Sequence, residues 1–294
     1  AGEQALLLET YADAVDPNVS TSMAEFRSEV DEWIPARSTR SDDWTVVSRV
    51  EVIWATFNEQ PDDVRTAIIP PVTEMVRGMA EFIDHQGDEG GIRIADQGEL
   101  DRYCYIAAGT VGNLITNLLT REGVSHQRSK RLYAHAEEFG LLLQLVNIAK
   151  DVHDDYTNEN NVYLPAEWLT DVNVDQAEII DPSNRKPVAS VICRTARHAN
   201  SFLDDAQTYL EKMPLSGGNT LAAWSVPFLL AVGTLRELRA RPEDALTEAG
   251  VKVSRREVLA VLDAATDIRR DSLGEFRHKI AREPFHLARD FTHD

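Results

Sequence analysis

Residues 139–156 read Phe-Gly-Leu-Leu-Leu-Gln-Leu-Val-Asn-Ile-Ala-Lys-Asp-Val-His-Asp-Asp-Tyr, and their pattern is the strongest indication of the fold. Because an α-helix turns by about 100° per residue, four polar residues fall within one stripe roughly 80° wide, namely Gln144, Asn147, Asp151 and Asp155. Apolar side chains occupy most of the remaining circumference: Leu142, Leu143, Leu145, Val146, Ile148 and Val152. A helix that is apolar nearly all round is a buried helix. The pattern therefore predicts a core helix whose polar stripe faces an internal cavity.

Two carboxylates on that stripe, Asp151 and Asp155, lie one helical turn apart. Burying an unpaired ion costs several kcal/mol, so a buried pair needs a neutralising partner. Mg²⁺ suits such a pair because it prefers oxygen ligands, keeps several waters and commonly binds substrate phosphates as well. The alternative is a solvated helix end with Lys150 and His153 as local partners. An isolated Asp-x-x-x-Asp would favour that alternative, but the two amides on the same face of an otherwise apolar helix favour the metal site.

A second segment, residues 102–120, has the same mixed character. Tyr103, Thr110 and Asn117 lie seven residues apart and share one helix face. Small residues make this helix thin: Ala107, Ala108, Gly109 and Gly112. Each glycine costs roughly 1 kcal/mol relative to alanine in a helix interior, which indicates that something approaches closely there. Two explanations stay open, namely tight packing against another helix, or room for a long apolar ligand with Tyr103 in its wall.

Helical patterns follow one another along nearly all of the chain, separated by Pro, Ser, Asp and Asn residues. Residues 90–94 form the single short candidate strand. An all-α bundle of about eight to ten helices is therefore the predicted fold class. A carboxylate-bridged di-iron bundle would need Glu-x-x-His pairs on core helices, and neither of the polar core segments, residues 102–120 and 139–156, has one. The predicted helices are Ala5–Val15, Ser22–Trp33, Val46–Asn58, Pro71–His85, Glu99–Thr120, Gln127–Tyr156, Pro187–Met213, Leu221–Arg239 and Arg255–Ile280.

Length and composition narrow the class of protein. At 294 residues and 43% apolar content, the chain can bury one large core, so we expect a single domain over residues 1–294. No run of ~18 uncharged apolar residues is present, which predicts a soluble protein or one with peripheral membrane contact only. Cys104 and Cys193 are too few for a disulfide framework or a thiolate metal site, and a reducing cytoplasm fits.

The charge balance is strongly acidic, with 49 Asp and Glu against 30 Lys and Arg and a net charge of −19. This argues against nucleic-acid binding, because phosphate contacts need clustered cations. Only six of the cations are lysines. An acidic surface that prefers arginine is what we expect of a protein working in concentrated salt, where screening weakens self-repulsion. An ordinary acidic cytoplasmic protein is the alternative.

The two polar segments together resemble the signature regions of the squalene/phytoene synthase family. Residues 103–112 are similar to its Y-C-x-x-x-A-G-x-V-G helix. The stretch from Gln144 to Asp155, followed by Val162-Tyr163-Leu164-Pro165, is similar to its second aspartate-rich helix and the turn after it. Residues 78–82 and 224–227 extend the resemblance over most of the chain. The implied fold is the all-α isoprenoid-synthase fold, a helical bundle around a central cavity.

The resemblance implies roles for particular residues. Asp151 and Asp155 would hold Mg²⁺ against a substrate diphosphate, and apolar walls would protect a carbocation from water. Tyr103 matches the tyrosine thought to help remove a proton as two chains join through a cyclopropyl intermediate. Further substrate- or cofactor-binding residues are expected at positions near the diphosphate, the nicotinamide or the apolar chain: Gln144, Asn147, Lys150, Gly109, Thr110 and Tyr163.

Three functions agree with this resemblance. A squalene synthase would condense two farnesyl diphosphates to presqualene diphosphate and reduce it with NADPH; residues 78–82, 226–227 and 251–255 are more like this branch, which we favour. A phytoene synthase would condense two geranylgeranyl diphosphates without a reductant, and residues 162–165 are more like that branch. The third is a non-catalytic relative that binds isoprenoid diphosphates. Product release by any of them would involve peripheral membrane contact, and the sequence does not indicate an oligomeric state.

Two departures from the family pattern matter. The family carries a first aspartate-rich motif, Asp-x-x-x-Asp in form, upstream of the region matching Ala1–Val15, and we find no counterpart. We therefore expect a chain shortened at its N-terminus, without the helix that bears that motif. The family also has a basic residue just before its aromatic-Leu-Pro turn. Asn160 and Asn161 stand in that place, which puts one diphosphate contact in question.

Overall fold

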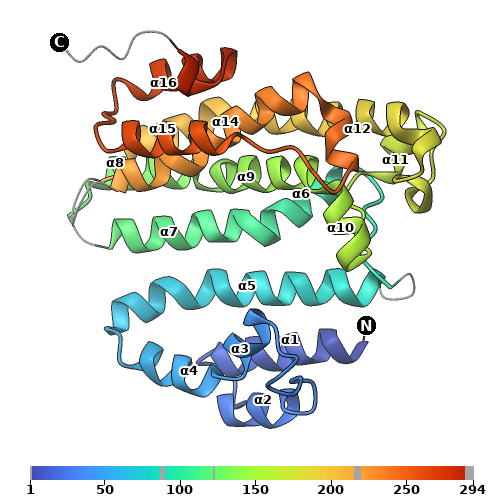
Figure 1. Ribbon diagram of the computed structural model, residues 1–294. Coiled ribbons are helices and arrows are strands. Elements are labelled where there is room, and N and C mark those ends of the chain that lie inside the picture. Colours follow the sequence, from blue (N-terminus) through green and yellow to red (C-terminus); the bar gives the residue numbers. More distant parts are fainter. Residues whose placement is uncertain (1, 87–89, 122, 215–219, 289–294) are drawn as a thin grey trace.

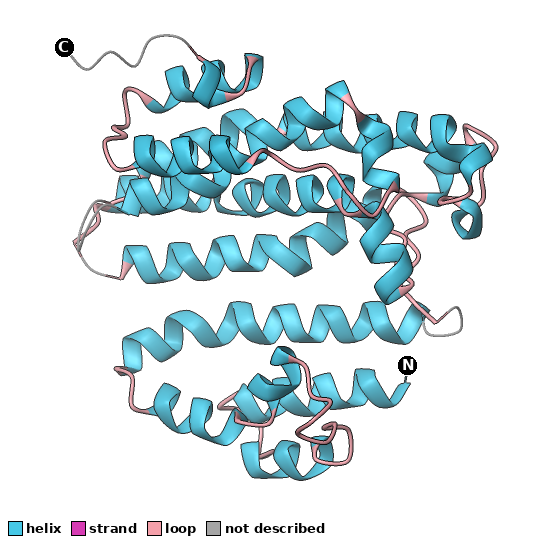
Figure 2. Cartoon of the chain, in the orientation of Figure 1, coloured by secondary structure: helices cyan, strands magenta, loops and turns pink. Residues whose placement is uncertain are grey.

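The computed structural model describes residues 2–86, 90–121, 123–214 and 220–288. These residues form an all-α bundle, as predicted (Figure 2). The α-helices are α1 (Gly2–Val15), α2 (Met23–Val30), α3 (Asp42–Val47), α4 (Val50–Asn58), α5 (Asp62–Gln86), α6 (Gln97–Cys104), α7 (Thr110–Thr120), α8 (His126–Tyr133), α9 (Ala136–Lys150), α10 (Val152–Glu159), α11 (Ala166–Thr170), α12 (Arg185–Ser201), α13 (Leu203–Lys212), α14 (Thr220–Ala240), α15 (Arg255–Ala265) and α16 (Leu273–Arg282). A π-helical turn, Tyr105–Gly109, joins α6 to α7.

The helices are stacked in layers (Figure 1). Helix α5 lies between α1 to α4 on one side and α7 on the other, and α9 follows α7, with α12 and α14 beyond it. The larger core is centred on α9, where Leu142 and Leu145 have no exposed surface. A smaller core lies under α1, α2 and α4 and contains Ala14, Val15, Met23, Phe26, Val30 and Val50. Helix α9 is therefore the buried central helix that its apolar circumference predicted.

Serine caps explain where several helices begin. Ser22 accepts a hydrogen bond from the amide of Glu25, whose carboxylate accepts one from the Ser22 amide, so α2 starts with a complete capping box. Ser41, Ser125 and Ser254 accept the equivalent amide bond at the starts of α3, α8 and α15. These local bonds fix the helix boundaries that precede the functional segments.

Five of the predicted helices are divided: Val46–Asn58 spans the junction of α3 and α4, Glu99–Thr120 contains the π-helical turn between α6 and α7, and three more are interrupted. The predicted helix Gln127–Tyr156 is α8, α9 and α10, with breaks before Ala136 and at Asp151. The predicted helix Pro187–Met213 is α12 and α13, and Arg255–Ile280 is α15 and α16. Each break lets the following helix change direction and cover a different part of the core, which a continuous period of 3.6 residues does not reveal.

The candidate strand at residues 90–94 contributes one isolated parallel bridge, between Arg93 and Val162. The amide of Ile94 donates to the Val162 carbonyl at 3.2 Å, and the amide of Val162 donates to the Ile92 carbonyl at 2.8 Å. This bridge holds the chain before α6 against the chain after α10. It therefore brings the two signature regions together.

Helix α14 is the longest apolar helix of the described residues. By length and composition it could cross a membrane, with a mean hydropathy of 1.3, but 61% of its apolar window is buried within the protein. Its buried residues include Phe228, Leu229 and Leu235, which belong to the larger core. Core packing therefore accounts for its apolar character.

Candidate active site

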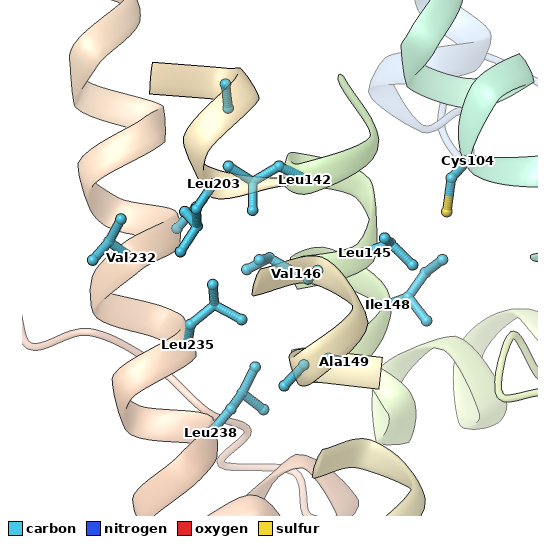
Figure 3. Close-up of a cluster of buried hydrophobic side chains, with 14 of the residues drawn as sticks. Cys104, Leu142, Leu145, Val146, Ile148, Ala149, Leu203, Val232, Leu235 and Leu238 are labelled. Atoms are coloured by element: carbon cyan, nitrogen blue, oxygen red, sulfur yellow. The ribbon is translucent and has the colours of Figure 1, made fainter. Parts of the chain in front are cut away.

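The polar stripe of α9 lies on the open side of that helix. Figure 3 shows the opposite side, where Leu142, Val146 and Ala149 face the core formed with α14. On the stripe, Asn147 is exposed and Gln144 is half-buried. The sequence predicted an enclosed cavity here. The stripe is open in the described residues because α1 to α4 pack on the far side of α5 and so do not cover α9.

Asp151 lies at the junction of α9 and α10, with φ −104° and ψ 15°, outside the helical region. Its amide still donates to the Asn147 carbonyl at 3.0 Å, and its own carbonyl accepts from the Asp155 amide at 2.9 Å. Asp155 therefore remains one turn beyond Asp151, as predicted, although the helix axis bends between them (Figure 1). The bend turns α10 toward the end of α5.

The carboxylates of this junction are crowded. Burial, together with the negative charges of Asp151 and Glu159, raises the pKa of Asp155 to about 7. Lys150 lowers it, but the Lys150 ammonium is already paired with the Asp151 carboxylate. Asp155 is thus a partly buried carboxylate that forms no ion pair with any residue the structure describes.

The donor set of the junction suits Mg²⁺. Two hard oxygen ligands one turn apart, in a site with excess negative charge, match a cation that takes one or two carboxylates and leaves other positions to water and phosphate. No group of three or more His, Cys, Asp or Glu side chains among the described residues could hold a metal ion by itself. A ligand with oxygen atoms of its own would therefore have to complete the coordination.

Tyr103 and Tyr163 form a buried pair beside this junction. The Tyr103 hydroxyl donates to the Tyr163 oxygen at 3.0 Å, and the ring centroids are 4.6 Å apart. Burial, with a smaller contribution from the charge of Asp155, raises the pKa of Tyr103 to about 12. Burial and the neighbouring Tyr103 raise the pKa of Tyr163 as well. Both side chains are therefore neutral phenols at physiological pH.

Asn161 connects the tyrosine pair to the acidic junction. Its amide nitrogen Nδ2 donates to the Tyr163 hydroxyl at 3.0 Å and to Glu159 at 2.9 Å. Its backbone amide donates to the Asp155 carbonyl at 2.9 Å, and its side-chain oxygen accepts from the Ile92 amide at 2.8 Å. Sequence reasoning regarded Asn161 only as a departure from the family pattern, whereas the structure places it at the centre of a hydrogen-bond network.

A cavity of about 520 Å³ adjoins this network. Four parts of the chain line it: α1, the end of α5, the loop before α6 with α6 itself, and the end of α10 with the turn after it. Its lining residues are Gln4, Met79, Ile83, Gly90, Gly91, Ile92, Tyr103, Glu159, Asn161 and Tyr163. The structure therefore brings Tyr103 and Tyr163, two of the site residues expected from the sequence, to the wall of one cavity.

The glycines of the second segment are explained by helix packing. A Cβ atom on Gly112 would lie 2.0 Å from the Ala136 carbonyl oxygen, and one on Gly109 would lie 2.7 Å from the Tyr105 ring. Reciprocally, a Cβ atom on Gly140 would lie 2.2 Å from the Ala108 carbonyl oxygen. Of the two explanations left open, close contact between this segment and α9 is the one that the structure shows.

Thr110 and Asn117 do not join Tyr103 in one functional face. The Thr110 hydroxyl is buried and donates to the Ile106 carbonyl at 2.8 Å. Asn117 donates to the Ala67 carbonyl on α5 at 2.9 Å. The π-helical turn between Tyr103 and Thr110 changes the angular period, so a spacing of seven no longer aligns their side chains.

Arg93 is a candidate that sequence reasoning missed. Its guanidinium donates to the side-chain oxygen of Asn160 at 2.8 Å and also to the Asn160 carbonyl. Asn160 has φ 55°, and a Cβ atom on Gly91 would lie 2.0 Å from the Asn160 carbonyl oxygen. The Arg93 guanidinium therefore lies beside Asn160, at the turn where the family pattern has a basic residue and this sequence has two asparagines. The signal for it was the Gly90-Gly91 pair, which permits this close approach.

Three carboxylates, two on α1 and one just after it, were also missed. Glu9, Asp13 and Asp16 surround Arg77 of α5, whose guanidinium lies 3.8, 2.8 and 3.5 Å from their oxygens. Glu9 and Asp13 are spaced as Glu-x-x-x-Asp, one turn apart on a helix. That spacing could have been found in the sequence, where only an Asp-x-x-x-Asp motif upstream of this region was expected.

The segment before α15 packs on the other side of the α9–α10 junction. A Cβ atom built on Gly250 would lie 4.0 Å from the Lys150 carbonyl oxygen. The next residue, Val251, is buried. The Lys252 side chain is exposed, and its carbonyl accepts a hydrogen bond from Arg241 at 3.0 Å. Lys252 is therefore held near Lys150, although 102 residues separate them in the sequence (252 − 150).

Comparison with known proteins gives a family match over most of the chain. The pattern of the squalene/phytoene synthase family matches residues 5–257. A 15-cis-phytoene synthase of Enterobacter agglomerans is 33% identical over 125 residues, which are 42% of this chain and 38% of that protein. A probable squalene synthase of Neurospora crassa is 24% identical over 201 residues, which are 68% of this chain and 40% of that protein. The aligned parts span less than half the length of these curated relatives.

Solved structures with the same fold include TcSQS in complex with the ligand BPH1237. It superposes with a TM-score of 0.72 at 17% identity and covers 98% of this chain and 84% of that one. A dehydrosqualene synthase in complex with a ligand superposes with a TM-score of 0.55 at 18% identity, covering 90% of this chain and 85% of that one. At these identities the likeness is one of fold.

Proposed function

The chain belongs to the squalene/phytoene synthase family, and from this we propose that it condenses two farnesyl diphosphates head to head to presqualene diphosphate and reduces that product with NADPH to squalene. The observation that carries the proposal is the pair Asp151 and Asp155 at the α9–α10 junction. Asp155 has a pKa of about 7 and, among the described residues, has no ion-pair partner. A carboxylate pair in that condition is suited to a Mg²⁺–diphosphate complex.

Asp151 and Asp155 would hold the metal. When bound, Mg²⁺ would supply stabilisation of the negative charge that develops on the leaving diphosphate. Gln144 and Asn147 lie on the same open stripe, where their amide groups can donate hydrogen bonds to phosphate oxygens. Arg93, held at Asn160, adds a guanidinium at the position where the family carries a basic residue.

Tyr103 is our candidate for assisting proton removal as the two chains join. Its pKa of about 12 means that it acts as a neutral phenol bonded to Tyr163, and not as a preformed phenolate. The cavity of about 520 Å³ beside it would receive part of an isoprenoid chain. Gly109 and Thr110 would contribute indirectly, by letting α9 and the second segment pack closely.

Glu9, Asp13 and Asp16 are our candidates for the opposing carboxylates of the metal site. Their present partner is Arg77, which neutralises them from α5. To hold the metal, these carboxylates would have to exchange Arg77 for the cation.

The reductant would bind beside Lys150 and Lys252. Both are cations at the edge of the junction, which suits the phosphates of NADPH, and the nicotinamide would supply hydride to the cyclopropyl product. The phytoene branch is the second candidate, because a phytoene synthase is among the relatives of highest identity. It would need no reductant and would take geranylgeranyl diphosphate.

Product analysis separates these branches. The chain would be incubated with Mg²⁺ and either farnesyl or geranylgeranyl diphosphate, each with and without NADPH. We expect squalene only from farnesyl diphosphate with NADPH. Phytoene from geranylgeranyl diphosphate, unchanged by NADPH, would establish the other branch. Substrate binding without any product, in this chain and in a form with additional N-terminal residues, would indicate the non-catalytic relative.

A further inference from the structure

A second groove lies between α12, α13, α14 and α16, and none of the candidate active-site residues lines it. It consists of two cavities of about 360 and 410 Å³ that share Asn200, Leu235 and Arg239. Cavities of ~300–1,000 Å³ are the usual size of small-molecule sites. The groove is open to solvent, since Asn200 and Arg239 are both exposed.

The rim of the groove is basic. Arg197 and Arg239 are exposed and make no hydrogen bond or ion pair with any residue that the structure describes. Arg277 is held in place, donating to Asp204 at 2.7 Å and to Gln207 at 3.0 Å, and His278 lies beside it. The lining residues of both cavities include no Asp or Glu. In a chain of net charge −19, this is an unusual concentration of unneutralised arginine.

The floor of the groove is apolar. Leu203, Val232 and Leu235 are only 5, 2 and 4% exposed, and Ala196 and Ala281 continue the same surface. Figure 3 shows Leu203, Val232 and Leu235 in the cluster that packs around Val146 of α9. Because these side chains belong to the core, the floor is rigid and cannot close over the groove by a change of one rotamer.

We infer that this groove binds a monomeric amphiphile with a phosphate-type anionic head group and an apolar chain. Arginine presents a planar set of donors that matches phosphate oxygens, and two guanidiniums without partners can provide it without breaking an existing ion pair. The apolar floor would cover the chain of the ligand, removing it from water. The site is independent of the proposed catalytic function, because it shares no residue with the α9–α10 junction.

Decyl phosphate, kept below its micelle concentration, is the probe, and calorimetry or ligand-observed NMR measures its binding to the whole chain. Decanol and inorganic phosphate test the two halves of the ligand separately. We expect both to bind at least about tenfold more weakly than decyl phosphate, since each lacks one set of contacts. Equal binding of decanol would overturn the anionic part of the inference, and equal binding of phosphate would overturn the apolar part.

The double variant Arg197→Gln and Arg239→Gln should weaken decyl phosphate binding at least about tenfold. Arg131→Gln, which removes a charge from an exposed arginine on α8 outside the groove, is the control and should leave the affinity unchanged. Equal affinity of the double variant and the unaltered chain would contradict the inference. Vesicles with anionic lipid test the other source of the same head group: binding to vesicles but not to decyl phosphate would show a membrane-binding surface and overturn the inference of a monomeric ligand.

Discussion

Asp155 lies half-buried one turn after Asp151, with Glu159 one turn further along α10 and Lys150 paired to Asp151. The sequence predicted the spacing of the two aspartates, because spacing follows from helical geometry alone. It could not predict the pKa of Asp155, since burial and the charge of Glu159 depend on how α10 bends away from α9. The ionisation of this one residue links the fold to the proposed chemistry.

Asp151→Asn and Asp155→Asn should each reduce kcat by about 10²–10³-fold or more, because each removes a ligand from the group that stabilises the leaving diphosphate. Steady-state kinetics with farnesyl diphosphate measures the effect, and far-UV circular dichroism should show unchanged helicity. Asp154→Asn is the matched control: Asp154 lies on the same helix but is exposed, so its kcat should stay within a few-fold. Unfolding of either variant would assign the pair a structural role instead.

The pKa of Asp155 predicts a pH dependence of metal binding. The group is protonated in the folded protein up to about pH 7, but only to about pH 4 when unfolded. Its contribution to stability is therefore present below about pH 4 and is lost as the pH rises through about 7. Mg²⁺ requires the ionised carboxylate, so the rise in Tm on adding Mg²⁺ should be small at about pH 6 and large at about pH 8. Asp155→Asn should abolish that pH dependence; an equal rise at both values in the unaltered chain would refute it.

The position of Arg93 predicts that this residue contributes to binding of the isoprenoid diphosphate. Arg93→Gln removes the guanidinium beside Asn160, so KM for the isoprenoid diphosphate should rise about tenfold, the effect of losing one charge-assisted hydrogen bond. Arg93→Lys should restore part of the affinity, because it keeps the charge but not the planar fork. If the lysine and glutamine variants behave alike, Arg93 only fixes the turn after α10 and does not meet the diphosphate.

Contacts between distant residues limited what the sequence could predict about the site. Tyr103 and Tyr163 are 60 residues apart, and Arg93 and Asn160 are 67 apart. Periodicity places a residue on a face of its own helix, but it says nothing of which other segment meets that face. From the sequence, only the resemblance to a known family indicated that the two signature regions belong to one site.

At the scale of elements, the sequence predicted which segments are helical and missed where the long helices divide. The region 127–156 has a continuous apolar period, yet it forms α8, α9 and α10. Asp151 has no capping side-chain bond and no proline beside it, so the break has no local signature. It occurs because tertiary contacts favour a new direction for α10, and propensity is a weak guide against such contacts.

The close contact between α7 and α9 predicts that adding a side chain at Gly112 destabilises the protein. In Gly112→Ala the new Cβ would lie 2.0 Å from the Ala136 carbonyl oxygen, so the free energy of unfolding should fall by about 2–3 kcal/mol as the helices separate. Urea unfolding monitored by circular dichroism measures this. Gly2→Ala is the control, because nothing lies within 4 Å of its Cβ position, and its stability should be unchanged or slightly higher. Equal stability of both variants would contradict the tight contact.

At the scale of the whole molecule, the layered arrangement explains why the polar stripe of α9 is open. Helices α1 to α4 form their own small core on the far side of α5. The sequence predicted the all-α class and the buried α9, because both follow from apolar periodicity. It did not predict two cores, since periodicity shows that a face is apolar but not which partner covers it.

The net charge of −19 predicts a dependence on salt. Screening shortens the range of charge repulsion from about 10 Å at 0.1 M salt to about 3 Å at 1 M. We therefore propose that the protein is salt-adapted and expect its Tm to rise as KCl is increased over this range. Thermal unfolding at several KCl concentrations measures the change, with sucrose of matched osmolality as the control for excluded-solute effects. A Tm independent of KCl would contradict salt adaptation and would favour an ordinary acidic protein.

We propose that this chain joins two isoprenoid diphosphates head to head at the Asp151–Asp155 junction. The most direct measurement is analysis of the products formed from labelled farnesyl diphosphate with Mg²⁺ and without any reductant. We expect presqualene diphosphate to accumulate, EDTA to prevent its formation, and added NADPH to convert it to squalene. Unchanged farnesyl diphosphate in every reaction, from this chain and from a form with additional N-terminal residues, would contradict the claim.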